Sequence, residues 1–381
     1  MKKLNLLFMG LLVAGGMVFT SCTKEDNPAV VVNDVTVPDI PSDKEAGLNP
    51  AIDPDQINTV IPNFNYSVNQ EYGVSVIRLD MTGVRDPFTN DWLELYGTKH
   101  PKQNVWLSLD GQGKGFSITK VANDKKSAVD LVFLVDNSGS MDEEAEAIAR
   151  DIAAWAEKLS QSLDICFGCV GYDGNLTGAM NITTVEKLKE YLDYGYGTNR
   201  TYHFGGDDAE ALAAKAPDYY NNWDECGVAA LHFADDNFNF RPGANRIYVN
   251  FTDEPNQPNG KPEFSTEWVK EVTNWPTTKG TIHSVYSDYN TWTQTIGYEE
   301  YPWNLADYTG GTSLFASWDF SGVTLDDLPV SGAMLNSYII RFTNVAEVFD
   351  GQPHLVKITV KSQSPNGEIL AEKDYKLTFT K

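Results

Sequence analysis

Four nearly continuous apolar runs in the middle of the chain constrain its fold more than any other feature. They occupy residues 130–136, 163–172, 246–253 and 281–287. Such runs are typical of parallel strands that are covered on both faces. Helical patterns separate them, and the first has an apolar stripe made of Ile148, Ile152, Trp155 and Leu159. The alternation predicts an α/β fold with a doubly wound parallel sheet over residues 126–335.

Strand-like segments with alternating apolar residues flank this region. Three lie before residue 125, including "VWLSLDG", and three after residue 336, including "HLVKITV". Each set is too small for a stable sandwich, but together they suffice for two packed sheets. We therefore expect one β-sandwich, formed by residues 63–125 and 336–381, into which the α/β domain is inserted.

The first 21 residues are predicted to be a targeting segment. Lys2 and Lys3 precede an apolar run that is short for a membrane span, and small residues follow in "VFTSC". "FTSC" resembles the lipobox of bacterial lipoproteins, and the "TKED" after it resembles surface-export signals of Bacteroidota lipoproteins. This resemblance implies lipidation at Cys22 and anchoring at the cell surface in the outer membrane. Residues 22–62, rich in Pro and Asp, are expected to form a flexible tether.

Charge narrows the choice of partners. The chain has 29 basic and 53 acidic residues, a net charge of −24. Nucleic acids and anionic membrane surfaces require positive patches, so we exclude both and expect membrane contact only through the lipid anchor. Divalent cations are the small partners that this charge favours.

Oxygen-bearing side chains follow two of the apolar runs. Asp136, Ser138 and Ser140 end the first, and Thr252 and Asp253 end the third. If these parallel strands are neighbours, the two carboxylates and the hydroxyls share one pocket. A hard cation relieves the repulsion between the carboxylates, and Mg²⁺ fits best, with Mn²⁺ or Ca²⁺ as alternatives.

Three motifs occur in this order: "DNSGSM", "FTDEP" and "LADYTGGTSLF". They resemble the von Willebrand factor type A (VWA) domain, whose metal-ion-dependent adhesion site (MIDAS) begins with Asp-x-Ser-x-Ser. The resemblance implies that Asp136, Ser138 and Ser140 are metal ligands, directly or through water. It implies the same for Asp253, whereas Thr252 is expected to shape the loop.

Many type A domains add a Thr ligand, and this chain departs from that pattern. The matching position is Glu225, which resembles the integrin β-subunit version of the domain. Asp207 and Asp208, in "FGGDDAEAL", are the competing residues. The integrin resemblance also offers Glu143 and Glu144 as holders of a second cation, although an acidic helix start is the favoured explanation for them.

Other chemistry has little support. Cys166, Cys169 and Cys226 cannot all pair with one another, so buried thiols are favoured over one bridge to Cys226. No hydrolase, zinc-protease or phosphate-loop motif occurs, so we expect a binder and not an enzyme.

The prediction is a surface lipoprotein that binds an acidic group of a protein or matrix ligand through Mg²⁺. Two alternatives remain. One is a glycan-binding lipoprotein of a polysaccharide uptake system, using the aromatic residues of "SDYNTWTQTIGYEEYPW". The other is an accessory or tip subunit of a surface fibre.

Overall fold

The computed structural model describes residues 37–121, 128–193, 201–222, 224–287, 300–317, 328–343 and 348–380. For residues 142–144 and 146 it describes the backbone alone. All these residues belong to one compact unit, Thr36–Lys381. No helix among them is long and apolar enough to cross a membrane.

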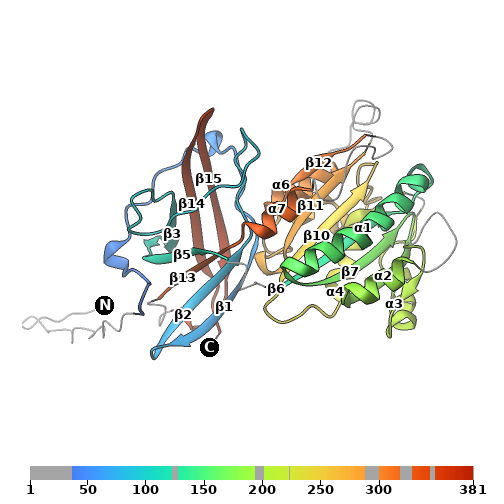
Figure 1. Ribbon diagram of the computed structural model, residues 1–381, viewed down its shortest axis with the longest axis horizontal. Helices are drawn as coiled ribbons and strands as arrows, with labels where there is room; N and C mark the ends of the chain where they lie inside the picture. The colour runs from blue at the N-terminus through green and yellow to red at the C-terminus, as the bar shows by residue number, and fades with distance from the viewer. Residues whose placement is uncertain are drawn as a thin grey trace, which may run out of the picture. The chain divides into compact units, whose positions relative to one another are not determined.

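The inserted domain is built on a seven-stranded sheet in the order β12-β11-β10-β6-β7-β8-β9 (Figure 1). Its strands are β6 (Ala128–Asp136), β7 (Asp164–Tyr172), β8 (Leu176–Thr183), β9 (Phe204–Gly205), β10 (Asn245–Thr252), β11 (Thr281–Tyr286) and β12 (Ser313–Phe315). Strands β7, β6, β10, β11 and β12 run parallel, and β8 is antiparallel to β7. If the two-residue edge strand β9 is left out and β6 is counted as strand 1, the remaining six strands follow the order 3-2-1-4-5-6 of doubly wound sheets.

Helices cover both faces of this sheet. They are α1 (Asp142–Ser162), α2 (Val185–Leu192), α3 (Ala209–Lys215), α4 (Gly227–Asn237), α5 (Thr266–Lys270), α6 (Pro302–Thr309) and α7 (Pro329–Leu335). Alternate residues of β6 enter different cores: Leu131 and Phe133 pack with α1, α2 and α7, whereas Val132 and Leu134 pack with α3 to α6. Because both faces are buried, the strand has to be apolar throughout, and the predicted α/β fold class is confirmed.

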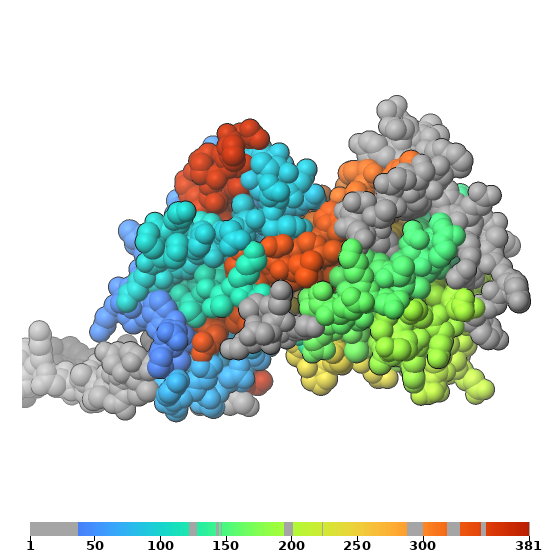
Figure 2. All heavy atoms as spheres, viewed as in Figure 1, coloured from blue at the N-terminus to red at the C-terminus, as the bar shows by residue number. Residues whose placement is uncertain are grey.

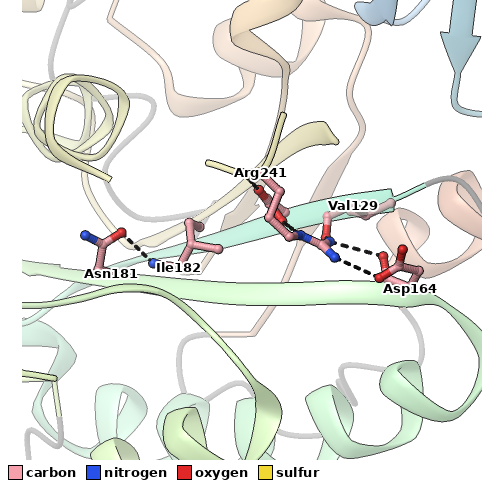
Figure 3. A network of polar contacts seen from close by, with 6 residues as sticks. Val129, Asp164, Asn181, Ile182 and Arg241 are labelled. Atoms are coloured by element: carbon pink, nitrogen blue, oxygen red, sulfur yellow. Dashed lines mark hydrogen bonds and ion pairs between the residues drawn. The ribbon is translucent and has the colours of Figure 1, made fainter. Parts of the chain in front are cut away.

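A buried ion pair closes the end of the sheet at which β6 begins. Asp130 is fully buried, and its carboxylate accepts hydrogen bonds from Arg241 Nε and from the Arg241 backbone N–H, both at 2.6 Å. The guanidinium also donates to Asp164 Oδ1 at 2.7 Å and to the Val129 carbonyl at 2.6 Å (Figure 3). One arginine thus links β6 to the neighbouring strand β7.

The other strands form two four-stranded antiparallel sheets, β1-β2-β13-β5 and β15-β14-β3-β4. They are β1 (Phe64–Glu71), β2 (Val74–Met81), β3 (Val105–Leu109), β4 (Gln112–Gly113), β5 (Phe116–Lys120), β13 (Tyr338–Phe342), β14 (His354–Ser364) and β15 (Gly367–Leu377). Ile77, Leu107 and Ile358 are among the residues of both sheets that share one core. This arrangement confirms a sandwich made of strands from both sides of the insertion.

Hydrogen bonds join the sandwich to the inserted domain. The Asn63 backbone N–H donates to the Thr309 carbonyl at 2.8 Å, and the Gly83 N–H donates to the Ala333 carbonyl of α7 at 3.0 Å. Gly310, in the left-handed region at φ 77°, ends α6 where an added Cβ would lie 2.4 Å from Pro62 Cα. A side chain there would therefore force the backbone at Ile61 and Pro62 to shift.

Helix α7 lies between α1 and the sandwich (Figure 2). Trp155 of α1 donates from Nε1 to Ser331 Oγ at 2.8 Å. On its other side the helix accepts the Gly83 bond described above.

Part of the expected tether contacts the sandwich. Within residues 37–62, Val37 and Ile61 are buried, and the Asn58 backbone N–H donates to the Leu370 carbonyl at 3.0 Å. Two short 3₁₀ turns lie here, Asp43–Glu45 and Pro54–Gln56. Val37, Ile40 and Ile61 account for this packing, because their side chains are buried in the hydrophobic clusters of the sandwich, whereas Leu48 and Ile57 are exposed.

The three cysteines of the folded part are free thiols. Cys166 is partly exposed, and Cys169 and Cys226 are buried. Cys226 forms no disulfide with Cys166 or Cys169, the two cysteines of β7. Its Sγ donates to Asn256 Oδ1 at 3.3 Å.

Candidate functional site

The candidate site lies where β6 and β10 end. These strands are adjacent and parallel, with Val135 paired to Phe251, so Asp136 and Thr252 end them at the same level. They are strands 1 and 4 of the order given above, and the chain leaves them toward opposite halves of the sheet. Doubly wound sheets bind ligands at this switch point, outside the carboxyl ends of the strands.

A continuous set of hydrogen bonds connects the predicted residues. Thr252 Oγ1 donates to Asp136 Oδ2 at 2.7 Å, and the Ser138 backbone N–H donates to Asp136 Oδ1 at 2.9 Å. The Ser138 and Ser140 hydroxyls lie 3.1 Å apart, and Ser140 Oγ donates to Asp253 Oδ1 at 3.2 Å. The fold therefore brings Asp136, Ser138, Ser140 and Asp253 together. Thr252, expected only to shape the loop, also contacts the Asp136 carboxylate.

Burial sets the electrostatics of Asp136. Its side chain is 0% exposed, and burial raises its pKa to about 7, helped by the charge of Asp253. The hydrogen bonds from Thr252 and Ser138 act in the opposite direction. No described Lys or Arg side chain forms an ion pair with Asp136. The fold thus buries a carboxylate next to a second one without a positive side chain from the described residues.

Hydrogen bonds of Asn137 hold the loop that follows β6. The Asn137 backbone N–H donates to the Tyr172 carbonyl at 2.6 Å, and Asn137 Nδ2 donates to Thr177 Oγ1 at 2.8 Å. Thr201 Oγ1 donates to Asn137 Oδ1 at 2.9 Å. Asn137 stands between two predicted ligands in the sequence, and sequence reasoning gave it no role. Its side chain orients the loop that carries both serines.

Glu225 lies within electrostatic reach of this cluster. Burial raises its pKa to about 8, and the charges of Glu254 and Asp136 add to the effect. Gln257 Nε2 donates to Glu254 Oε2 at 2.8 Å and to Glu225 Oε2 at 3.2 Å. Sequence reasoning missed Glu254 and Gln257. Glu254 could have been found from its place directly after Asp253.

Asp207 and Asp208 lie elsewhere. They follow β9, the edge strand, which is separated from β6 by β7 and β8. Asp207 is fully exposed and lies 3.7 Å from Lys187 Nζ, and Asp208 Oδ2 accepts from Asn181 Nδ2 at 2.5 Å. Since β9 runs parallel to β8, which is antiparallel to β7, these residues follow the end of β9 that points away from Asp136.

Some predicted residues fall outside the description. Cys22 and the side chains of Glu143 and Glu144 lie outside the described residues, as do residues 288–299 of the aromatic segment. In its described part, Tyr301 and Trp303 stack with centroids 4.5 Å apart, and Trp303 packs edge-on against Tyr286 and Phe315. These two rings are thus engaged in packing.

The donor set at the site fits a hard cation. Among the described residues, no group of three or more His, Cys, Asp or Glu side chains could hold a metal ion by itself. At Asp136, however, the hydroxyls of Ser138 and Ser140 complement two carboxylates. An ionised carboxylate has about four lone-pair positions, so the two bonds that Asp136 accepts leave others for a cation or its water. Oxygen ligands of this kind suit Mg²⁺, with waters completing its coordination.

Known structures resemble parts of the chain. BatB from Bacteroides thetaiotaomicron matches with a TM-score of 0.33 and 14% identity, covering 50% of this chain and 90% of that one. Proximal thread matrix protein 1 from the mussel byssus, with a zinc-occupied MIDAS motif, gives 0.37 and 14%, covering 58% and 49%. The vWF domain of the type V pili tip protein Mfa5 from Porphyromonas gingivalis gives 0.28 and 11%, covering 55% and 93%.

No protein-family model matches this chain, and no curated protein matches it. The TM-scores are all below 0.5, so the proposals below rest on the residues of this chain.

Proposed function

We propose that this protein is a cell-surface binding protein that holds an acidic group of a protein or matrix ligand through a divalent cation, Mg²⁺ in the first place. The cation would be bound by Asp136, Ser138, Ser140 and Asp253, with Glu225 at the rim. Because the net charge of the chain is −24, a bound cation would be needed to attract an acidic ligand.

One observation carries the proposal. Asp136 is fully buried, its pKa is raised to about 7 by burial, and the like charge of Asp253 raises it further. A buried carboxylate normally has a cationic partner, because an unpaired buried charge is costly. A cation from solution would supply that partner.

Each residue has a separate task. Thr252 and the Ser138 N–H hold the two Asp136 oxygens at 2.7 and 2.9 Å, which fixes the direction of the carboxylate. The hydroxyls of Ser138 and Ser140 provide neutral oxygens, so a bound cation would keep net positive charge. This positive charge would allow the cation to bind a carboxylate of the partner and so link the two proteins. Gln257 holds Glu225 at the rim.

The remaining parts of the proposal come from the sequence. Lipidation at Cys22 would place the protein on the outer membrane, and the absence of catalytic motifs favours a binder over an enzyme. Feeding cells an alkyne-bearing fatty acid tests the anchor: the chain should be labelled and lose its label in Cys22→Ala. External protease should cleave it on intact cells. If either result is not obtained, only the proposed lipid anchor and surface location are contradicted, and the proposed cation site is not affected.

Calorimetric titration with MgCl₂, MnCl₂ and CaCl₂ tests the site in the chain from residue 23 onward. Wild type should bind one Mg²⁺, and Asp136→Asn and Asp253→Asn should abolish binding while keeping the circular-dichroism spectrum. Asp207→Asn is the matched control, because this exposed carboxylate lies outside the cluster. The cation site would be refuted if none of the three salts gave binding heat with wild type. It would also be refuted if Asp136→Asn bound Mg²⁺ with the same affinity as wild type.

A further inference from the structure

A groove on the sandwich has no part in the cation site. Its volume is about 830 Å³, within the range of about 300–1,000 Å³ that is usual for ligand sites. The connection between β2 and β3, strand β3, and the β14–β15 hairpin supply most of its lining. No residue of the seven-stranded sheet or its helices lines it. A ligand here would therefore be bound independently of the metal.

Three aromatic side chains line the groove: Trp92, Tyr96 and Trp106, each partly exposed. Packing holds Tyr96 and Trp92 in position. His100 stacks on the Tyr96 ring with centroids 4.1 Å apart. The Trp92 indole lies so close to α7 that a Cβ added at Gly332 would be 2.2 Å from its Nε1. Rings that are already held in place lose little conformational entropy when a ligand packs on them.

The lining has four acids and two bases, and most of these charges are paired or hydrogen-bonded. Glu368 Oε1 pairs with Lys361 Nζ at 2.9 Å, and Glu94 Oε1 pairs with Lys120 Nζ at 2.8 Å. Asp86 Oδ1 accepts two backbone N–H groups, from Phe88 at 2.8 Å and from Thr89 at 3.3 Å. Two acids of the lining, Asp86 and Asp91, and one base, Lys102, have no ion pair in the described part of the chain. The groove therefore complements neither a polyanion nor a polycation.

Hydrogen-bonding groups of both kinds surround the rings. Asn104 fixes the loop by donating to the Glu94 carbonyl at 2.8 Å and accepting from the Tyr96 N–H at 2.7 Å. Asp91, Lys102 and Gln103 then offer an acceptor, a donor and an amide at the groove. A ligand that combines apolar ring faces with many neutral hydroxyls uses all these features.

We propose that this groove binds a neutral oligosaccharide, whose sugar rings pack on Trp106 and Tyr96 while Asp91, Lys102 and Gln103 bond its hydroxyls. The C–H groups on one face of a pyranose form an apolar surface that matches an aromatic ring. Its hydroxyls donate and accept, which suits the mixed polar lining. The protein would thus carry a glycan site on the sandwich and a cation site on the inserted domain.

Titrations monitored by tryptophan fluorescence and calorimetry test this on the chain from residue 23 onward, in EDTA. The neutral probes are maltohexaose, cellohexaose, xylohexaose, mannohexaose and chitohexaose, and the charged ones are oligogalacturonate and hexalysine. We expect saturable binding of at least one neutral probe and none of the charged probes. Binding should be the same in Asp136→Asn, which separates this proposal from the cation site.

Variants locate the binding. Trp106→Ala and Asp91→Asn should each weaken it about tenfold or more, which is the loss expected from one stacking or charge-assisted contact. Tyr96→Phe keeps the ring and should bind nearly as wild type, whereas Tyr96→Ala should not. Trp268→Ala is the matched control, since this partly exposed indole lies on α5. The proposal is overturned if no neutral probe binds, if only a charged probe binds, or if Trp106→Ala and Asp91→Asn both bind like wild type.

Discussion

Strand β6 carries two fully buried aspartates, Asp130 near its start and Asp136 at its end. Asp130 is bound by Arg241 Nε at 2.6 Å. The same guanidinium reaches Asp164 on the next strand (Figure 3). Asp136 accepts hydrogen bonds from the uncharged residues Thr252 and Ser138 and lies near a second carboxylate. The same residue type on the same strand therefore has two different environments.

The two ends of β6 differ in whether the described residues supply a cationic partner for the buried carboxylate. At Asp130 the chain provides its own cation, so the pair is complete when the protein folds. At Asp136 the described residues provide no cationic side chain, and the proposed site takes its cation from solution. Each prediction below changes one of these ends and leaves the other as an internal control.

The largest effect is expected at the Asp130 end. Arg241→Ala would leave the Asp130 carboxylate buried without its ion pair, and breaking such a pair costs about 3–5 kcal/mol. Urea unfolding monitored by circular dichroism measures this loss. Arg150→Ala is the control, since its contact to Asp151 is 3.8 Å long and exposed, worth less than about 1 kcal/mol. Equal losses in the two variants would mean that Asp130 and Arg241 do not form a structural pair.

The next effect is a pH dependence at Asp136 in EDTA. Its folded pKa is about 7 and its ordinary value 3.8, so the folded state holds the proton over this range. This contribution to stability is full below about pH 4 and is lost as the pH rises through 7. Each pH unit in this window is worth about 1.4 kcal/mol.

Urea unfolding of wild type and Asp136→Asn between pH 4.5 and 8 measures this dependence. The difference between the two proteins should change by a few kcal/mol, and the other carboxylates cancel in it. A constant difference would show that the Asp136 carboxylate is as well compensated as that of Asp130.

Added cation should act on one end only. Mg²⁺ at about 100 times its dissociation constant should stabilise wild type by about 2.7 kcal/mol, measured as a rise in the thermal unfolding midpoint. The rise should vanish in Asp136→Asn. It should persist in Arg241→Ala, because that substitution leaves the Asp136 end of the strand unchanged. If Asp136→Asn keeps the rise, the ion binds elsewhere.

Much of the fold could be predicted because the pattern of apolar residues in the sequence reflects which strands are buried. Strands β6, β7, β10 and β11 have helices on both faces and are therefore apolar throughout, which makes them visible. Strand β1 was missed although Phe64, Tyr66 and Val68 alternate, because the polar residues between them resemble a loop. Its recognition depends on pairing with β2, a contact that periodicity does not contain.

The two aspartates show the same limit for the site. Asp136 could be singled out because Ser138, Ser140 and the "FTD" motif have local spacing. The partner of Asp130 lies 111 residues away, and nothing in the sequence around Arg241 indicates the pairing. Gln257, which holds Glu225, was missed for this reason too. Local motifs can be read from a sequence, whereas partners brought together by the fold cannot.

The smallest change in stability, and the sharpest test of the Asp136 end, is Ser140→Ala. The exposed hydroxyl bonds Asp253 at 3.2 Å, so its loss should cost less than about 1 kcal/mol in EDTA. The same loss should weaken Mg²⁺ binding by calorimetry about tenfold or more, because an oxygen at the ion is removed. Ser160→Ala, on the far end of α1, should change neither quantity. A Ser140→Ala variant that is destabilised without losing Mg²⁺ affinity would make this loop as purely structural as the Asp130 pair.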